Sequence, residues 1–335
     1  MNRPPALTAD VPDVQASVPA TQVSLSRVGV TGVEKVLSIR GDDGPQLFHA
    51  ELECYIDLNP RQAGVHMSRF EEVVNEAIDT VILGETLRAE ELAALIAGQV
   101  RERQDGLRAE VRVAARYPET VPAPASGIPT QEMYGLFGTA VASELGTRTL
   151  IGVEAQGMTA CPCAQEMVAS RSRTRLAEQG FDDDEIERIL GAVPVATHNQ
   201  RGIGTLYVGS PEDAGPDVDA RELLRLVEQS MSSEIYELMK RADEVEVVER
   251  AHANPRFVED CVREMVRRVL EMLGDLGDDA FVMARQENLE TIHRHNVVAE
   301  RYGTVAELRE EIATGAHERH HRTMREWLEA PAQGD

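Results

Sequence analysis

The chain has 335 residues and is poor in several residue types, and each shortage excludes a class of protein. It contains only four cysteines, Cys54, Cys161, Cys163 and Cys261, which are too few for a disulfide scaffold. We therefore expect a reducing, cytoplasmic setting. No apolar run approaches the roughly 18 residues of a membrane helix, and the N-terminal residues lack the apolar core of a signal peptide.

Positive charge is scarce as well. The 34 lysines and arginines face 58 acidic residues, which gives a formal net charge of −24. This balance argues against binding to nucleic acid or to an anionic membrane. Lysine occurs only at Lys35 and Lys240, so arginine supplies nearly all the positive charge. Arginine binds phosphate and carboxylate in a bidentate manner, and an anionic small substrate therefore remains compatible with the overall charge.

The apolar and turn-forming residues alternate in a pattern that predicts mixed secondary structure. Strands are expected at 27–40, 46–58, 107–117, 131–143, 147–157, 202–209 and 279–287. Helices are expected at 68–83, 89–103, 165–179, 183–190, 219–241, 255–273 and 304–314. Turns are expected at 41–44, Gly146 and Gly180. Ser68 and Glu71 form a capping box, and Pro255 follows Asn254 as a predicted helix start.

The element order divides the chain into two similar halves. Residues 1–24 have no regular period and are interpreted as a disordered arm. Residues 25–125 form a first unit, and the Pro- and Gly-rich segment 118–129 is read as a linker. Residues 126–316 form a second unit with a helical insert at 165–194, and 317–335 form a polar tail. This order predicts an α+β fold with an antiparallel sheet and helices on one face.

Two cysteines and a histidine suggest a metal site. Cys161 and Cys163 flank Pro162, and thiols at this spacing do not readily close on each other. Soft sulfur ligands favour zinc or ferrous iron. His198 lies in the polar segment 197–202 and is a second candidate ligand. The alternative is that both cysteines are small core residues, since free cysteine is easily buried.

A carboxylate could complete this site. Asp243 or Glu244 is a candidate hard ligand, and three protein ligands with one open position are typical of catalytic zinc. Otherwise both acids are solvated. Lys240 and Arg241 precede them and are interpreted as closing a helix, where the helix dipole favours cations.

Other titratable residues cluster in two segments. Glu290, His293 and His295 bring proton carriers together, whether their segment is helical or extended. The loop with Arg61, His66 and Arg69 precedes a capped helix and could hold phosphate, or could form surface salt bridges. Glu259 lies at a predicted helix start, where acids are favoured in any case. The histidines at 317, 320 and 321 are interpreted as a solvated surface of a charged helix.

As a set, these motifs resemble the type IB GTP cyclohydrolases. The matching segments are 59–69, Cys161-Pro162-Cys163, His198-Asn199-Gln200-Arg201-Gly202, Glu228-Gln229-Ser230, Lys240-Arg241-Ala242-Asp243-Glu244, 254–260 and 287–295. They occur in the order of that family and span residues 27–303. The resemblance implies a tunnelling fold (T-fold), two such units fused in one chain, and a homo-oligomer, usually a tetramer, with sites at chain interfaces.

The resemblance also implies roles for individual residues. Cys161, His198 and Glu244 match metal ligands for Fe(II), Zn(II) or Mn(II), and Glu259 matches the acid that anchors guanine. Glu290, His293 and His295 match polar groups of the active site, with Cys161 counted among the catalytic residues. Four residues are candidates for binding the triphosphate of GTP: Arg61, Arg69, Lys240 and Arg241.

The expected activity is hydrolytic opening of the imidazole ring of GTP with release of formate, giving 7,8-dihydroneopterin triphosphate. Ala242 stands where the family commonly has proline. The long join between Cys163 and His198 resembles the archaeal branch, whose product is the 2′,3′-cyclic phosphate, and this product is the alternative. More distant alternatives are a T-fold nitrile reductase with a cysteine nucleophile, and a non-catalytic oligomer with a structural metal.

Overall fold

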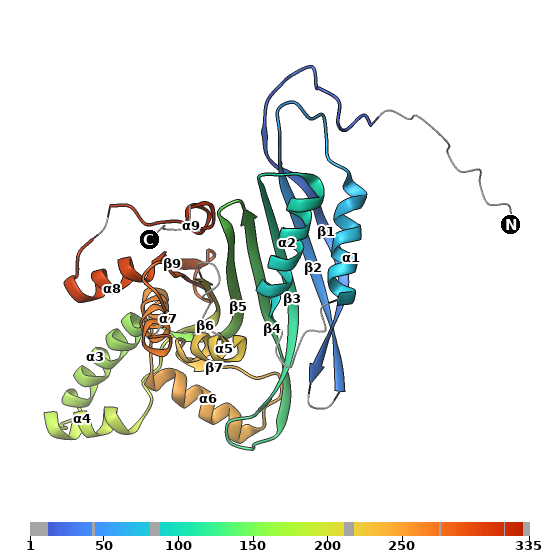
Figure 1. Ribbon diagram of the computed structural model, residues 1–335. Coiled ribbons are helices and arrows are strands. Elements are labelled where there is room, and N and C mark those ends of the chain that lie inside the picture. The colour runs from blue at the N-terminus through green and yellow to red at the C-terminus, as the bar shows by residue number, and fades with distance from the viewer. Residues whose placement is uncertain are drawn as a thin grey trace.

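The computed structural model describes residues 13–41, 44–80, 88–210, 218–274, 276–317 and 319–330. Its centre is a nine-stranded antiparallel sheet with the order β1-β2-β3-β4-β5-β6-β8-β9, and the short β7 pairs with β5 (Figure 1). The strands are β1 (Leu25–Gly41), β2 (Gly44–Leu58), β3 (Arg108–Pro122), β4 (Pro129–Ser143), β5 (Gly146–Ala160), β6 (Asn199–Ser210), β7 (Ser233–Glu234), β8 (Phe281–Leu289) and β9 (Val297–Thr304). The α+β prediction is therefore confirmed.

Helices connect these strands. They are α1 (Met67–Thr80), α2 (Ala89–Gln104), α3 (Pro162–Glu178), α4 (Asp183–Ala192), α5 (Ala220–Gln229), α6 (Arg241–Ala253), α7 (Val258–Met272), α8 (Val305–Thr314) and α9 (Met324–Glu329). The predicted turn residues at 42–43 and the predicted helix end at 81–83 lie outside the described residues. The strand β9 follows the strand expected at 279–287, in a segment for which the sequence predicted no strand.

The main core lies between the sheet and one layer of helices. Alternate residues of each strand face this layer, because successive side chains of a strand point to opposite faces. On β2 these residues include Leu52 and Ile56, which are buried together with Val74 of α1 and Ile96 of α2. Burial of each such side chain contributes roughly 1.5–3 kcal/mol relative to exposure. The helices α5, α7 and α8 extend the same core over β5, β6 and β8.

The C-terminal segment departs from the predicted polar tail. Trp327 of α9 is fully buried on the opposite face of the sheet, where its ring stacks on Phe281 at 5.6 Å between centroids. Val141 and Leu150 belong to the same small cluster. The prediction of a polar tail was wrong because one tryptophan and Leu328 suffice to dock a short helix. The helices that cover the main core, α1, α2, α5, α7 and α8, lie on one face of the sheet, and α9 lies on the other.

Half of the predicted linker 118–129 is strand. Residues of β3 and β4 pair up to Pro122 and Pro129, so only the tip of this hairpin is a turn. The sheet consequently runs without a break past the expected boundary between residues 125 and 126. Asp243 of α6 holds the tip, accepting hydrogen bonds from the backbone N–H groups of Ala125 and Ser126 at 2.8 and 2.7 Å. These bonds hold the pKa of the Asp243 carboxyl well below its usual range.

The expected helix 219–241 is interrupted. After α5 the chain leaves the helix at Ser230, because Ser233 and Glu234 pair with the end of β5 as β7. A new helix, α6, starts at Arg241. The predicted helix start at Pro255 was wrong, since α7 begins at Val258.

Two further segments test the predictions. The helical insert is confirmed as a hairpin: Gly180 has φ +94, and Asp182 caps α4 in a capping box with Glu185. The described part of the predicted disordered arm contacts the rest of the chain. The N–H groups of Ala63 and Gly64 donate to the carbonyl of Gln15 at 3.0 and 3.1 Å.

Candidate metal and active site

Strand register brings the central candidates to one edge of the sheet. Ala160 of β5 pairs with Asn199 of β6, and Arg201 of β6 pairs with Leu289 of β8. Cys161, His198 and Glu290 are each the next residue beyond these pairs. The three residues, far apart in the sequence, therefore lie at the ends of three adjacent strands.

Cys161 and His198 are direct neighbours. The Cys161 N–H donates to the His198 carbonyl at 3.1 Å, and the Thr197 hydroxyl donates to the Cys161 carbonyl at 2.7 Å. Cys161 is the N-cap of α3, and Pro162 occupies the first turn, where its missing N–H has no consequence. Cys163 lies in the same turn but is exposed. The fold thus separates the two thiols, with Cys161 half-buried next to the histidine.

The imidazole of His198 faces two acceptors. Its Nδ1 lies 3.1 Å from Oε1 of Gln200 and 3.8 Å from Oε2 of Glu290. The Glu290 side chain is only 6 % exposed, and its Oε2 makes no hydrogen bond. A buried carboxylate oxygen without a hydrogen bond is costly, so a charged or donating partner is expected there.

Polar side chains form a buried floor below this edge. Gln286 and Asn288 of β8 are almost fully buried, and Gln286 Nε2 donates to Asn288 Oδ1 at 3.1 Å. Oε1 of Gln286 and Oγ1 of Thr159 have no hydrogen-bond partner. The floor requires a glycine on β6, because a Cβ at Gly202 would lie 2.3 Å from Gln286 Nε2.

Glu244 does not lie with Cys161 and His198 in the described chain. It is exposed in the first turn of α6, beside the Asp243 anchor of the hairpin tip. The opposite end of α6 is the one near Cys161: the His252 carbonyl accepts from Gln165, and the Arg256 N–H donates to Ala160. At 1.5 Å per residue, Glu244 is roughly 14 Å along the helix from that end.

The donor set therefore fits a metal only in part. A thiol, an imidazole and a buried carboxylate are the ligand chemistry of a transition metal. Yet among the described residues there is no group of three His, Cys, Asp or Glu side chains that could hold an ion. Cys161 and His198 suit two ligand positions, and the described residues of the chain do not supply a third beside them.

Glu259 lies close to this edge along the chain. It is the second residue of α7, three residues after Arg256, whose N–H donates to the carbonyl of Ala160 at 3.0 Å. The exposed Glu259 borders a hollow of about 320 Å³ between α7, α8 and β9 that is lined by Val262 and Val266. An acid next to an apolar hollow is compatible with binding a flat heterocycle.

His293 and His295 lie in the exposed loop between β8 and β9. Their rings stack with centroids 5.2 Å apart and an interplanar angle of 13°. This confirms the expectation that the two proton carriers lie together. Of the three residues predicted in this segment, Glu290 turns towards His198 and the two histidines face solvent.

The four candidate triphosphate ligands are spread over the molecule. Arg69, in the first turn of α1, donates to the carbonyl of Arg103 in α2 at 3.1 Å, and Arg61 is exposed in the loop before α1. The helices α1 and α3 lie at opposite sides of the molecule in Figure 1. Lys240 is the exposed N-cap of α6 and Arg241 is its first residue, so the interpretation that they close a helix was wrong.

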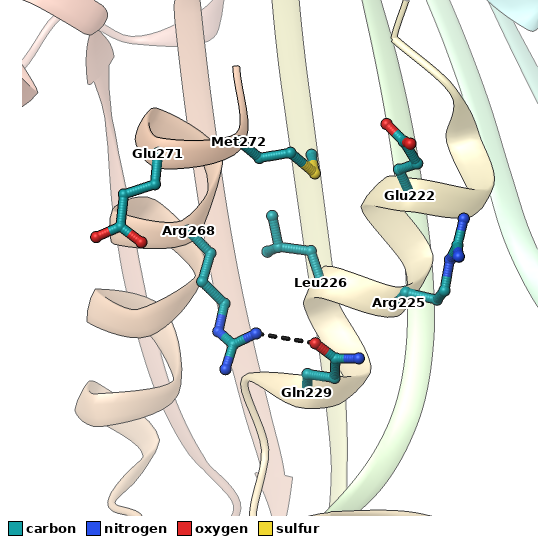
Figure 2. A pocket seen from close by; sticks show the side chains of 7 residues that line it. All are labelled: Glu222, Arg225, Leu226, Gln229, Arg268, Glu271 and Met272. Atoms are coloured by element: carbon teal, nitrogen blue, oxygen red, sulfur yellow. Dashed lines mark hydrogen bonds between the residues drawn. The ribbon is translucent and has the colours of Figure 1, made fainter. Parts of the chain in front are cut away.

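A larger hollow lies elsewhere. About 490 Å³ lies between α5 and α7, where Arg268 donates to Gln229 at 2.9 Å (Figure 2). Glu222, Arg225 and Glu271 line it too, so that two acidic and two basic side chains, Arg268 included, balance in charge. None of the predicted site residues borders this hollow, so it is not the candidate site.

Two features of the site region were missed from the sequence. Gln200 is 5 % exposed beside His198, and the available signal was its spacing of two residues from His198, just before the strand expected at 202–209. Glu228 is half-buried at the end of α5, and partial burial is the main cause that raises its pKa to about 7. The Tyr134 hydroxyl donates to Glu228 Oε1 at 2.8 Å. Only tertiary structure pairs these two residues.

Comparison with solved structures identifies the fold class of this protein. The chain is similar to a crystal structure of uricase from Arthrobacter globiformis, with a TM-score of 0.52, 10% identity and coverage of 88% of this chain and 96% of that one. At this identity the likeness shows the fold alone, which is the T-fold. No helix among the described residues is long and apolar enough to cross a membrane.

The sequence comparisons define the family. Residues 11–299 match the family described as type I GTP cyclohydrolase folE2, and the chain belongs to it. Proteins named GTP cyclohydrolase MptA are 41% identical over 307 residues in Methanococcus aeolicus, 42% over 309 in Haloarcula marismortui and 41% over 314 in Methanosarcina acetivorans. These matches cover 90%, 92% and 91% of this chain and 99%, 99% and 98% of the relatives. They support the archaeal branch of the resemblance.

Proposed function

We propose that this protein is a GTP cyclohydrolase that opens the guanine imidazole ring of GTP by hydrolysis and releases formate. The observation that carries the proposal is the meeting of Cys161, His198 and the buried Glu290 at the ends of β5, β6 and β8. It occurs in a chain that shares about 40% identity with GTP cyclohydrolases over nine-tenths of its length. The two fused T-fold units and a homotetramer are part of the proposal.

The proposed product is 7,8-dihydroneopterin 2′,3′-cyclic phosphate. The sequence favoured the triphosphate as the main expectation, and the MptA relatives support the alternative instead. A 2′,3′-cyclic phosphate forms when the 2′-hydroxyl of the neopterin side chain attacks the innermost phosphorus of its triphosphate. The outer two phosphates then leave as pyrophosphate, which provides a second measurable product.

The proposed cofactor is a divalent metal, Fe(II), Zn(II) or Mn(II), with Cys161 and His198 as two ligands and Glu244 as the predicted third. When bound, such an ion acts as a Lewis acid and lowers the pKa of a bound water towards about 7. The incomplete donor set of one chain agrees with a site that a second copy completes. Arg61 and Arg69 of that second copy are then candidates for holding the triphosphate.

The remaining residues have proposed roles in binding and proton transfer. Glu259 accepts hydrogen bonds from the N–H edge of guanine, and a base without those donors would leave the carboxylate unpaired. His293 and His295 carry protons to and from the opening ring, because imidazole titrates near neutral pH. Lys240 and Arg241 are further candidates for the phosphates.

The test is anaerobic incubation of the purified protein with GTP and each metal in turn. Formate is assayed directly, pyrophosphate enzymatically, and the pterin by mass spectrometry. Formate with pyrophosphate and a cyclic phosphate supports the whole proposal. Formate with the triphosphate would retain the cyclohydrolase and reject the product, and absence of formate with every metal rejects both.

A matched pair of variants tests the metal assignment. Cys161→Ala should lose bound metal and turnover, whereas Cys163→Ala, at the exposed thiol of the same turn, should keep both. Metal content separates this proposal from a nitrile reductase that uses a cysteine nucleophile without metal. Equal metal content and formate release in Cys161→Ala and the unmodified protein would remove the central assignment.

A further inference from the structure

We infer that Gln200 and Glu290 are positioning residues, which hold the imidazole of His198 in the tautomer with hydrogen on Nδ1. This inference rests on the proposed function for the identity of the ion that His198 binds. It changes the role of Glu290, which was predicted to act in catalysis. It also assigns a role to Gln200, which the sequence motifs included without one.

The register of β6 and β8 places Gln200 and Glu290 beside His198. His198 and Gln200 are two residues apart at the start of β6, so their side chains share the helix-covered face of the sheet. The pair Arg201–Leu289 continues to Gln200 and Glu290 on the next strand. Backbone pairing alone therefore puts one amide and one carboxylate beside the same imidazole.

Both polar neighbours of the His198 imidazole present oxygen atoms to its Nδ1. Oε1 of Gln200 is 3.1 Å from Nδ1, and Oε2 of Glu290 is 3.8 Å from the same atom. An ionised carboxylate only accepts hydrogen bonds, and the amide oxygen does the same. Only the Gln200 oxygen is close enough to accept a hydrogen bond from Nδ1, and the Glu290 carboxylate acts on the same atom through its nearby negative charge. Both effects favour a hydrogen on that nitrogen. The lone pair of the neutral ring is then left on Nε2, which is the form that binds a metal.

The side chains of Gln200 and Glu290 are both buried. Gln200 is 5 % exposed and the Glu290 side chain 6 %, so water does not readily replace either contact. Below them, Gln286 and Asn288 are buried and bonded to each other. A carboxylate or carbonyl that holds the second nitrogen of a metal-bound histidine typically changes metal affinity 10–100-fold when removed.

The experiment compares three single variants. Gln200→Met keeps the length of the side chain and removes the acceptor. Gln200→Glu keeps an acceptor and cannot donate, so it excludes the flipped amide as an explanation. Gln156→Met is the control: Gln156 lies on β5, on the opposite face, and contacts Arg201 at 3.3 Å.

The first readout needs no metal. The ¹⁵N shifts of histidine-labelled, metal-free protein at pH 8 report which nitrogen of His198 carries hydrogen, with His198→Gln for assignment. We expect Nδ1–H in the unmodified protein, Gln200→Glu and Gln156→Met, and a mixture of tautomers in Gln200→Met. Hydrogen on Nε2 in the unmodified protein overturns the inference.

The second readout is the affinity for Co(II), followed by its thiolate absorption. Gln200→Met should weaken binding 10–100-fold. Gln200→Glu should stay within a few-fold of the unmodified protein, and Gln156→Met should not differ from it. Equal affinity of Gln200→Met and the unmodified protein overturns the inference. Failure to release formate from GTP, with the tautomer as expected, rejects the proposed function and leaves this inference standing.

Discussion

Replacement of Glu228 by glutamine should stabilise the protein above neutral pH and leave its stability nearly unchanged in mild acid. Glu228 lies at the end of α5, where burial is the main cause that raises its pKa from 4.5 to about 7. The acidic side chains of Glu234, Glu119 and Glu132 add to this effect by repulsion. Only the Tyr134 hydroxyl opposes it, by donating a hydrogen bond.

The sign follows from proton binding. Between pH 4.5 and about 7 the folded protein holds a proton on Glu228 that the unfolded chain has released. Stability therefore falls as pH rises through this window and is constant above it. A shift of about 2.5 pKa units corresponds to about 3 kcal/mol that the ionised carboxylate costs at pH 8. Glutamine avoids this cost and still accepts from Tyr134.

The assay is urea unfolding at fixed protein concentration from pH 5 to pH 8.5, since assembly would make stability depend on concentration. The gain of Glu228→Gln over the unmodified protein should grow from near zero at pH 5 to a maximum at pH 8. The exposed Glu222→Gln on the same helix is the control and should show no such trend. A gain that is independent of pH, or largest in acid, would refute the reasoning.

Three further variants test contacts that stabilise different parts of the fold. Trp327→Ala should lower the free energy of unfolding by about 3–5 kcal/mol, because it opens a cavity under α9 and removes the 2.7 Å hydrogen bond from Nε1 to the Asp279 carbonyl. Urea unfolding measures this loss, and Leu238→Ala, at an exposed position, is the control. Gly202→Ala should cost about 1–3 kcal/mol, because its Cβ meets the buried Gln286, and an unchanged urea midpoint would contradict the buried floor. Asp243→Asn should lower the melting temperature and speed proteolysis at residues 123–128. The pKa of Asp243 is lowered in the folded protein, so the difference should shrink as the pH falls below 4, and a difference that does not shrink would show that the lost charge is not the cause.

Much of the fold could be predicted from the sequence, because strands and helices have different periods. Seven of the nine described strands and the helical hairpin were predicted from those periods and from turn residues. The elements that were not predicted share one cause. The two-residue strand β7 and the buried Trp327 depend on contacts with β5 and Phe281, and a local pattern carries no trace of such contacts.

The candidate site divides in the same way. Cys161 and His198 could be chosen from their polar, proline- and glycine-containing surroundings, and the structure brings them together. Glu244 was chosen by family resemblance, and the described chain leaves it near the other end of α6. The contacts of Gln200 and Glu290 with the imidazole could not be predicted, because they depend on how three strands align.

By itself, the sequence determined the chemical inventory: a thiol, imidazoles and carboxylates in polar segments, arranged in an acidic chain of mixed strands and helices. Periodicity and side-chain chemistry are local properties, and a linear chain displays them directly. Only the tertiary structure decided which of these groups meet. A shift of one residue in the pairing of β6 with β8 would turn Glu290 to the other face, and that register is set by the packing of the whole sheet against its helices.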